Sequence, residues 1–582
     1  MNKNAALTAA QLLVDALLSE GVDTVFCVPG ESYLAVIDAL YGVREQIRLI
    51  VCRHEGSAAF MAEAYAKASG RPGVCFVTRA PGATQASIGL HTAHQDSTPL
   101  VLFIGQASSE MLDREAFQEV DYRRVFGPMA KWVGQVDDPS RMPEMVSRAF
   151  HTALLGRRGP VVLALPEDVL SSRVNTPPNI AKAVRVPQLA PTPGDIQELL
   201  GLLASSQRPL VVLGGTGWTP QAVENIRLFI KATGVPVACS FRRQDLFDNR
   251  DPHFIGVLGL GADPALHEAV KSSDLLILMG ARMGEVPSAG YTLIQSPQPS
   301  QKLVHAMPSP DELGKVYRPD LSMVVTMPAL AASLAACVPS VELPGRFESF
   351  RKTCRESYER YSQPADMARS GALALAGTLD QAHVWHALNA ALPQDVVITN
   401  GAGNYTAYLH RYYRYPSFGS QIAPTSGAMG YGLSAAIGAK LARPNRPVVC
   451  VAGDGCFMMS SHELITAVRL GLPIVVLVFD NQMYGTIRMH QERWFPERVH
   501  ATDLENPDFV ALALAHGAQA KVIQSIESLI TALLDGFKAK GPTLLHIRTD
   551  PERIGPSGTI TSIRGKALEA LRACNNSSYV TC

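Results

Sequence analysis

The stretch from residue 448 to residue 483 constrains the fold of this chain more than any other. Residues 448–452 form a short apolar run rich in β-branched side chains, which is typical of a buried strand, and the run ends at a Gly-Asp-Gly turn. Residues 463–470 have apolar positions three and four apart, as in a helix, and Ser460 stands at capping-box spacing before them. A second buried strand is predicted over 473–479. Two parallel strands joined by a helix predict an α/β fold with a doubly wound parallel sheet.

Asp454 and Asn481 come shortly after these two predicted strands. The carboxyl ends of parallel strands meet at one edge of a sheet, where open α/β sheets bind ligands. A carboxylate oxygen, an amide oxygen and the backbone carbonyl of Met483 are hard ligands that suit Mg²⁺ holding a diphosphate. Gly455 allows the backbone to approach phosphate oxygens. The alternative is an ordinary strand-helix-strand unit without a metal.

The alternation of strands and helices recurs along all 582 residues, which are too many for a single core. We expect three doubly wound α/β domains over residues 1–185, 190–340 and 365–582. A proline-rich segment within 177–193 and a charged segment over 341–370 are the predicted linkers. The clearest predicted strands are 24–28, 49–52, 73–78, 99–104, 160–165, 209–213, 236–239, 275–279, 303–306, 396–399 and 543–547.

Composition excludes several classes of partner. The formal net charge is zero, which argues against nucleic acid and against an acidic membrane surface. No apolar run has the length of a membrane span, and the N-terminal stretch is broken by Asp15 and Glu20, so it resembles an amphipathic helix more than a signal peptide. The ten cysteines contain no Cys-x-x-Cys pair, and several lie in apolar strands. This pattern is typical of reduced thiols in a cytoplasmic enzyme.

The Gly-Asp-Gly turn followed by Asn481 closely resembles the signature of thiamine diphosphate enzymes. The run HEGSAAFMAEAYAKASG, which contains Glu55, resembles the acetolactate synthase and pyruvate decarboxylase group of that family. The resemblance covers nearly the whole chain and is strongest over residues 50–170 and 396–495. It implies three domains: a pyrimidine-binding, a central and a diphosphate-binding domain. It also implies thiamine diphosphate and Mg²⁺ as cofactors, with Asp454, Asn481 and Met483 as the metal ligands.

The resemblance also implies roles around the cofactor. Glu55 would bond a nitrogen of the pyrimidine ring, whereas by itself a glutamate at a helix start is more often a partner of the helix dipole. Met429 would hold the cofactor in a bent shape and Gly427 would accept from its amino group; for Met429 the alternative is core filling. The residues expected near the diphosphate are Gly403, Asn404, Tyr405, Gly455, Cys456 and Tyr484, although the first three also suit an ordinary turn.

Substrate contacts are predicted in a second run. Acetolactate synthases carry an Ala-Phe-Gln-Glu run in the substrate site, which makes Phe117 and Gln118 candidates here, with Lys131 as a weaker one. One of His91 and His94 could relay a proton, although packed or surface positions are the favoured interpretation of both.

Three features depart from the resembled family. Ala80 replaces a glycine in the turn before Pro81, and we expect a slightly shifted turn. His490 aligns with a tryptophan that favours the larger second keto acid in biosynthetic acetolactate synthases, which puts that pathway in doubt. Gly214 to Gly217 follow a strand in the middle domain but lack a full dinucleotide fingerprint. We therefore favour a purely structural middle domain over one that binds FAD.

These features together predict an acetolactate synthase-like enzyme. It would decarboxylate a 2-keto acid, most simply pyruvate, and add the resulting enamine to a second carbonyl. The alternatives are another thiamine diphosphate lyase, carboligase or decarboxylase, such as a 2-hydroxyacyl lyase or a benzaldehyde lyase-like enzyme. A silent cofactor-binding subunit and a nicotinamide oxidoreductase are less favoured. The resemblance implies a homodimer or homotetramer whose active sites lie between the first domain of one subunit and the last domain of another.

Overall fold

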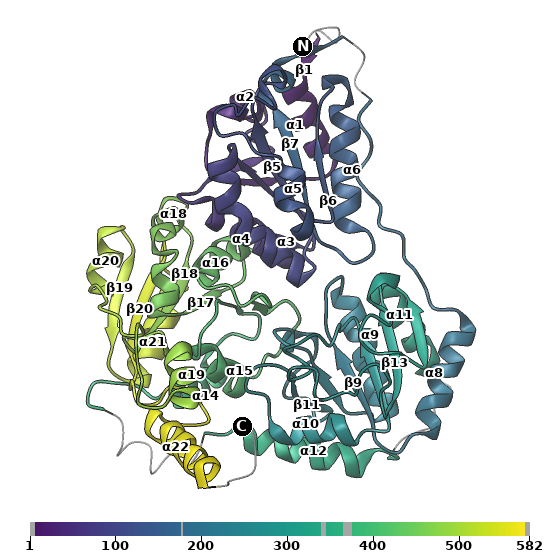
Figure 1. The fold of residues 1–582 in the computed structure, drawn as a ribbon, viewed down its shortest axis with the longest axis vertical. Coiled ribbons are helices and arrows are strands. Elements are labelled where there is room, and N and C mark those ends of the chain that lie inside the picture. The colour runs from purple at the N-terminus through teal and green to yellow at the C-terminus, as the bar shows by residue number, and fades with distance from the viewer. Residues whose placement is uncertain (1–5, 176–178, 339–344, 365–374, 577–582) are drawn as a thin grey trace.

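The computed structural model describes residues 6–175, 179–338, 345–364 and 375–576. It shows three lobes, each a six-stranded parallel sheet flanked by helices, which confirms the predicted fold class (Figure 1). The N-terminal lobe stands above the other two, and its helices α3 and α4 point toward them. Pro177, Pro178, parts of the 341–370 segment and the last six residues of the chain lie outside the described residues.

The N-terminal sheet has the order β3-β2-β4-β5-β7-β6. A separate antiparallel pair, β1 with β8, joins the two ends of this domain. The elements are β1 (Leu7–Thr8), α1 (Ala9–Ser19), β2 (Thr24–Cys27), α2 (Leu34–Gly42), β3 (Arg48–Val51), α3 (Glu55–Ser69), β4 (Gly73–Val77), α4 (Ala80–Asp96), β5 (Leu100–Gln106), α5 (Tyr122–Phe126), β6 (Trp132–Gln135), α6 (Met142–Leu154), β7 (Pro160–Pro166), α7 (Glu167–Ser171) and β8 (Arg173–Val174).

The middle sheet has the order β11-β10-β9-β12-β13-β14. The predicted charged linker contains a helix, α12, whose Tyr358 packs in the core of this domain against Phe254, with ring centroids 5.1 Å apart. The elements are α8 (Pro193–Ser205), β9 (Pro209–Leu213), α9 (Pro220–Thr233), β10 (Val237–Cys239), β11 (Phe254–Val257), α10 (Pro264–Ser272), β12 (Leu275–Met279), β13 (Lys302–Met307), β14 (Leu321–Val324), α11 (Met327–Cys337) and α12 (Glu348–Tyr361).

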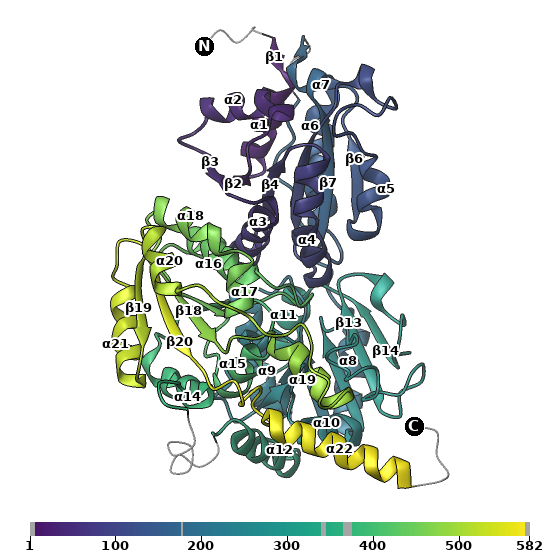
Figure 2. The same ribbon diagram turned by 60° about the vertical axis from the view of Figure 1, so that its left-hand side comes forward.

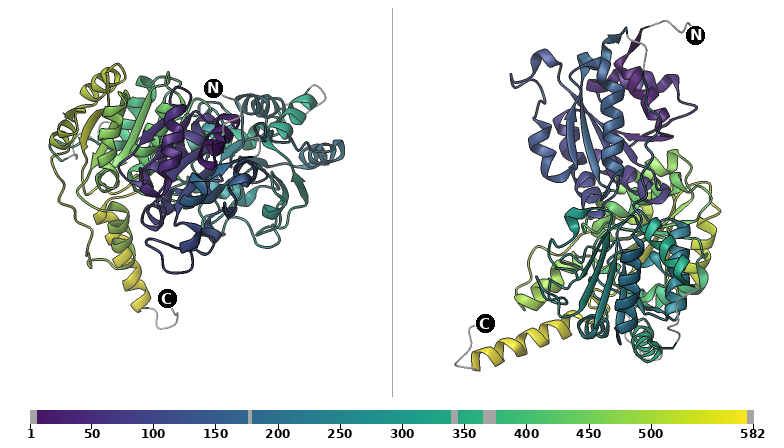
Figure 3. Two further views of the ribbon diagram at one scale, coloured as in Figure 1. Left: turned by 90° about the horizontal axis from the view of Figure 1, so that it is seen from above. Right: turned by 90° about the vertical axis from the view of Figure 1, so that its right-hand side faces the viewer.

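The C-terminal sheet has the order β16-β15-β17-β18-β20-β19. Helix α22 extends from this domain away from the body of the molecule (Figures 2 and 3) and is tied to α19 where Arg564 donates to Glu492 at 2.6 and 2.7 Å. The elements are α14 (Gln381–Ala391), β15 (Val397–Asn400), α15 (Tyr405–Tyr412), β16 (Gln421–Ile422), α16 (Tyr431–Ala442), β17 (Val448–Gly453), α17 (Asp454–Met458), α18 (Leu464–Arg469), β18 (Ile474–Asp480), α19 (Gly485–Trp494), α20 (Phe509–Ala515), β19 (Gln519–Ile523), α21 (Ile526–Gly536), β20 (Thr543–Arg548) and α22 (Ile560–Asn576).

Helix α3 joins the N-terminal and C-terminal domains. It is buried on nearly every side, because it packs against α4 and also against α16 of the C-terminal domain. Small residues make this approach feasible: a Cβ atom at Gly438 would lie 2.3 Å from the Met61 carbonyl oxygen, and one at Gly89 would lie 2.3 Å from the Cβ of Ala59. One apolar cluster therefore spans both domains.

Two local predictions differ from the structure. Ser460 and Glu463 form no capping box, because the Glu463 carboxylate is used elsewhere: it accepts from the backbone amides of Arg53 at 2.9 Å and His54 at 3.1 Å. Helix α4 begins at Ala80, where a turn was predicted, since proline is favoured in the first turn of a helix and Pro81 occupies it. The expected turn at Ala80 is thus helical.

Candidate functional site

Asp454 and Asn481 lie just beyond the carboxyl ends of the adjacent parallel strands β17 and β18. The predicted juxtaposition of these residues at one sheet edge is therefore present. Asp454 is buried, with 3% of its surface exposed, whereas Asn481 is half-buried. The Met483 carbonyl oxygen accepts from the Gly485 amide at 2.9 Å, and a carbonyl oxygen retains a second lone pair.

The Asp454 carboxylate is held from two sides. Its Oδ1 accepts from the Gly455 amide at 2.8 Å, and its Oδ2 accepts from Nδ2 of Asn506 at 2.9 Å. The same Nδ2 donates to Oδ1 of Asp480 at 3.0 Å, and Oδ2 of Asp480 lies 2.9 Å from Nε2 of His546. Burial, reinforced by the nearby Asp480, raises the pKa of Asp454. Asn506 and Asp480 were missed by the sequence analysis, since no local pattern links Asn506 to the Gly-Asp-Gly turn.

This arrangement fits a cation bound together with a phosphorylated ligand. A nearby positive charge stabilises the ionised form of a buried carboxylate whose pKa is raised. The described residues contain no group of three or more His, Cys, Asp or Glu side chains that could hold a metal by themselves. An ion at Asp454 would therefore depend on neutral oxygens, such as those of Asn481 and Met483, and on oxygens of the ligand.

The side chains beside Asp454 serve packing. Cys456 is buried, and its sulfur accepts from the Tyr405 hydroxyl at 3.2 Å and from the Gly430 amide at 3.3 Å. The Tyr484 ring covers Gly455, where an added Cβ would lie 2.8 Å from a ring carbon. The Gly455 amide, expected to face phosphate, is bonded to Asp454. A ligand bound beside Asp454 would therefore contact backbone groups of this segment and not the side chains of Cys456 and Tyr484.

Gly403, Asn404 and Tyr405 follow β15 at the same sheet edge. The Asn404 amide does not point freely into the edge: its Oδ1 accepts from the Thr486 hydroxyl at 2.9 Å, and its Nδ2 donates to the Ile554 carbonyl at 2.8 Å. Asn400, the last residue of β15, has a buried Oδ1 with no partner among the described residues. Asn400 thus offers an acceptor at this edge that no described residue uses. Asn400 was missed in the sequence analysis, although its position directly after the predicted strand 396–399 could have indicated it.

Gly427 and Met429 lie on the loop from Ala423 to Gly430, between β16 and α16. Gly427 is exposed, with φ +70°, and nothing lies within 4 Å of where its Cβ would be. Met429 is half-buried and packs against the cluster that contains Tyr405 and Cys456. The loop therefore borders the segment that carries Asp454.

Glu55 is the first residue of α3 and lies beyond the carboxyl end of β3. A Cβ atom at Gly82, in the first turn of α4, would lie 3.2 Å from Oε1 of Glu55. The Ala80 amide at the start of the same helix donates to the Gln118 carbonyl at 3.1 Å. Glu55, the start of α4 and Gln118 thus gather at one edge of the N-terminal sheet, and the adjacent Phe117 side chain is 69% exposed.

Several candidates lie away from both edges. Lys131 precedes β6 at the opposite, amino edge of the sheet from Glu55 and donates to the Leu155 carbonyl at 2.5 Å. His91 and His94 lie in the second half of α4, remote from the start of that helix, which lies beside Glu55. His490, by contrast, is exposed on α19, which begins beside the C-terminal edge.

The described residues of this chain contain no hydrogen bond or ion pair between Glu55 and the C-terminal domain. We refer to the N-terminal edge with Glu55 and the C-terminal edge with Asp454 as the two half-sites of the chain.

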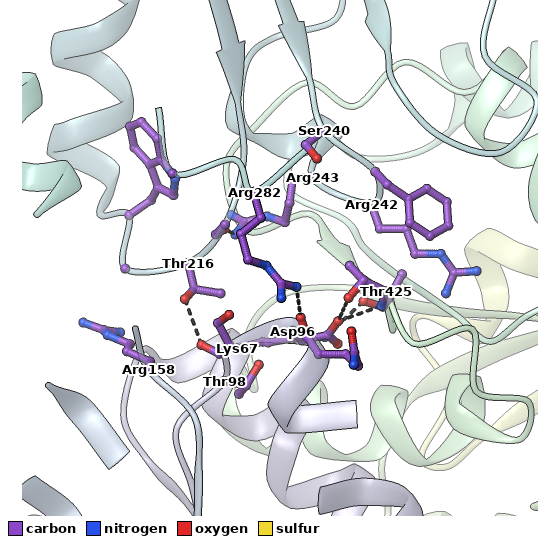
Figure 4. A pocket seen from close by; sticks show the side chains of 18 of the residues that line it. Lys67, Asp96, Thr98, Arg158, Thr216, Ser240, Arg242, Arg243, Arg282 and Thr425 are labelled. Atoms are coloured by element: carbon purple, nitrogen blue, oxygen red, sulfur yellow. Dashed lines mark hydrogen bonds and ion pairs between the residues drawn. The ribbon is translucent and has the colours of Figure 1, made fainter. Parts of the chain in front are cut away.

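The middle domain adds a cavity that the sequence analysis did not predict. It has a volume of about 900 Å³ and lies where the carboxyl edge of the middle sheet faces α4 and the Ala423–Gly430 loop (Figure 4). Arg158, Arg242 and Arg282 line it, and Arg158 has no hydrogen-bond or ion-pair partner in the described part of the chain. Gly215 has φ +67°, and a Cβ there would lie 2.2 Å from the Gly280 carbonyl oxygen, so glycine is required at this wall.

Sequence comparisons agree with the three-domain geometry. Family models of the thiamine pyrophosphate enzymes match all three parts: the N-terminal TPP binding domain over 7–125, the central domain over 196–334 and the C-terminal TPP binding domain over 401–547. The acetolactate synthase isozyme 2 large subunit of Escherichia coli is 33% identical over 97% of this chain and 100% of that protein. The acetolactate synthase large subunit of Parasynechococcus marenigrum is 31% identical over 94% and 88%, and a probable one of Methanocaldococcus jannaschii is 30% identical over 96% and 95%.

Proposed function

The chain belongs to the acetolactate synthase family of thiamine pyrophosphate enzymes, and we propose that it decarboxylates pyruvate and joins the remaining two-carbon unit to a second carbonyl compound. The observation that carries this proposal is the placement of Asp454 and Asn481 beyond adjacent strands, next to the loop of Gly427 and Met429. When bound, thiamine diphosphate supplies the electron sink for the loss of carbon dioxide.

The residues of the chain bind and orient this cofactor. Asp454, Asn481 and the Met483 carbonyl would hold Mg²⁺ against the diphosphate, with Asn506 fixing the Asp454 carboxylate. The exposed Gly427 carbonyl would accept from the amino group of the pyrimidine, and Met429 would support the bent shape. Glu55 would hold a proton at the pyrimidine ring nitrogen.

We propose that two copies form each active site. Among the described residues, Glu55 makes no hydrogen bond or ion pair with the C-terminal domain of its own chain, which is consistent with a half-site that the C-terminal domain of a second copy completes. Large apolar side chains are exposed beside both half-sites: Phe117 in the N-terminal domain, and Met459, Ile487 and Trp494 in the C-terminal domain. Exposed apolar surface of this kind is typical of a protein interface. A homodimer is the minimum assembly, and a homotetramer consists of two such pairs.

The cavity in the middle domain supports a dinucleotide such as FAD more strongly than the sequence did. Its volume lies within the range of cofactor pockets, and Arg158 is an unpaired cation at its wall. Arginine is well suited to bind phosphate. Addition of FAD to the purified protein tests this proposal: a rise in Tm that Arg158→Ala diminishes supports it, and an unchanged Tm argues against it.

No helix in the described part of the chain is both long and apolar enough to cross a membrane. Six cysteines are buried free thiols, which supports the proposed cytoplasmic location: Cys27, Cys52, Cys75, Cys239, Cys450 and Cys456.

The deciding experiment is turnover of a panel of 2-keto acids with and without added FAD. Acetolactate from pyruvate supports the proposal. Acetaldehyde alone would indicate a simple decarboxylase, and the absence of any product from pyruvate would indicate a different donor substrate.

A further inference from the structure

The loop from Ala423 to Gly430 is held by side chains from the other two domains. Lys67 of α3 donates to the Ala423 carbonyl at 3.0 Å, and Arg242 of the middle domain donates to the Pro424 carbonyl. Asp96, at the end of α4, accepts from both the backbone amide and the hydroxyl of Thr425, the amide at 2.7 Å. Figure 4 shows Asp96 and Thr425 facing each other across the domain boundary. The three domains therefore meet at three consecutive loop residues.

Asp96 belongs to a buried charge cluster. Its second carboxylate oxygen pairs with the Lys67 ammonium, which also lies 3.0 Å from Glu63. Glu63 has no exposed surface and accepts from the Thr98 hydroxyl at 2.7 Å and from the Tyr431 hydroxyl at 2.5 Å. Removing two carboxylates and one ammonium from water costs free energy unless their ion pairs and hydrogen bonds have good geometry. A protein in which such a buried cluster is replaced by apolar side chains is often equally stable. Fold stability alone is thus a poor explanation for this cluster.

The cluster fixes the loop at both ends. Thr425 is bound by Asp96, and Tyr431, the first residue of α16, is bound by Glu63. Only five residues lie between these anchors, and they include Gly427 and Met429. Within this span, the Ser426 hydroxyl lies 3.0 Å from that of Thr92, and the Gly430 amide donates to Cys456. The position of Gly427 and Met429 therefore depends on the N-terminal domain of the same chain.

We propose that Asp96 is a positioning residue for the thiamine diphosphate site. Through its hydrogen bonds to Thr425 it fixes the position of Gly427 and Met429 relative to the bound pyrimidine ring. This inference rests on the proposed role of those two residues. In this proposal Asp96 acts through the loop and makes no contact of its own with thiamine diphosphate. The same anchor also borders the middle-domain cavity, since Lys67, Asp96, Arg242 and Thr425 all line it.

The test compares Asp96→Asn, Thr425→Val and Thr425→Ser in the full-length protein with Mg²⁺. Cofactor affinity is measured by calorimetry, and the state of the bound pyrimidine by near-ultraviolet circular dichroism. The loss of one hydrogen bond to a charged group should weaken cofactor binding roughly tenfold in Thr425→Val and alter the dichroism, whereas Thr425→Ser restores both. Thr233→Val is the control, because Thr233 is fully buried and its hydroxyl bonds, among the described residues, to Phe229 and Ile230 of its own helix.

Two results would overturn the inference and can be told apart. If Met429→Ala changes affinity and dichroism while Asp96→Asn and Thr425→Val change only Tm, the anchor is merely structural and the inference fails alone. If Met429→Ala changes neither quantity, the proposed role of the loop fails and the inference fails with it. Thr425→Val retains the backbone bond to Asp96, so it gives an answer even where Asp96→Asn does not fold.

Discussion

The buried carboxylate of Glu463, in the C-terminal domain, accepts a hydrogen bond from the backbone amide of Arg53 in the N-terminal domain at 2.9 Å. The next amide, of His54, donates to the same oxygen at 3.1 Å, and the residue after it is Glu55. The proposed catalytic glutamate thus starts its helix from a backbone that the other domain of the same chain holds in place.

Replacement of Glu463 should therefore destabilise the protein and impair Glu55. Glu463→Ala leaves two part-buried amides without their acceptor and should cost about 2–4 kcal/mol in the free energy of unfolding, whereas Glu463→Gln retains an acceptor oxygen and should cost about 1 kcal/mol. Denaturant unfolding of each variant measures the loss. Glu198→Ala is an exposed control, and a loss for Glu463→Ala no larger than for this control would contradict the prediction.

Glu55→Gln should retain cofactor binding and lose most of the turnover. The amide keeps the shape of the side chain but cannot hold the proton at the pyrimidine ring nitrogen, and kcat should fall by about 10²–10⁴-fold. Steady-state kinetics and calorimetry separate the two effects. Glu31→Gln, exposed at the same edge of the N-terminal sheet, is the control. Unchanged turnover in Glu55→Gln would refute the assigned role.

Asp454→Ala should abolish magnesium-dependent cofactor binding. It removes the only carboxylate of the proposed ligand set, and the affinity for thiamine diphosphate with Mg²⁺ should fall by more than about 100-fold. Calorimetry with and without the metal measures this, with the exposed Asp535→Ala as control. If Asp454→Ala still binds the cofactor more tightly with Mg²⁺ than without it, the metal site lies elsewhere.

Magnesium binding should also weaken in acid. Burial, reinforced by Asp480, raises the pKa of Asp454, so the carboxyl keeps its proton at a higher pH than an ordinary aspartate. A metal must displace that proton, so affinity is full above the raised pKa and declines by up to about tenfold per pH unit below it. Calorimetry in two buffers of different ionisation enthalpy should show proton release that grows on acidification. An affinity that stays constant from about pH 8 to 5.5 would contradict this.

His490→Trp should shift the choice of the second substrate. A tryptophan on the exposed face of α19 adds apolar surface for a larger keto acid, and pocket changes of this size alter selectivity about tenfold or more. Competition between pyruvate and 2-ketobutyrate as acceptors, read from the two products, measures the ratio. His500→Trp is a control outside α19. An unchanged product ratio would show that residue 490 does not reach the acceptor.

Local patterns predicted much of the C-terminal site. Strand periodicity and the Gly-Asp-Gly turn placed Asp454 and Asn481 at one sheet edge, because parallel strands joined by a helix leave no other arrangement. The same reasoning failed for Ser460, where capping-box spacing is present but Glu463 is drawn to the amides of another domain. Lys131, a candidate from the resemblance, lies at the amino edge of its sheet, which the local sequence did not indicate.

By itself the sequence determined the three parallel sheets, the helix that begins at Glu55 and the edge that carries Asp454, since each depends on side-chain periodicity within some tens of residues. Only the tertiary structure decided what holds these parts in place: Asn506 between two carboxylates, Glu463 on the backbone before Glu55, Asp96 on the Met429 loop and the cavity of the middle domain. These contacts join residues that are far apart in the chain or in different domains. Their partners are chosen by distance in space and by the cost of burying an unpaired polar group, and neither leaves a pattern in the local sequence.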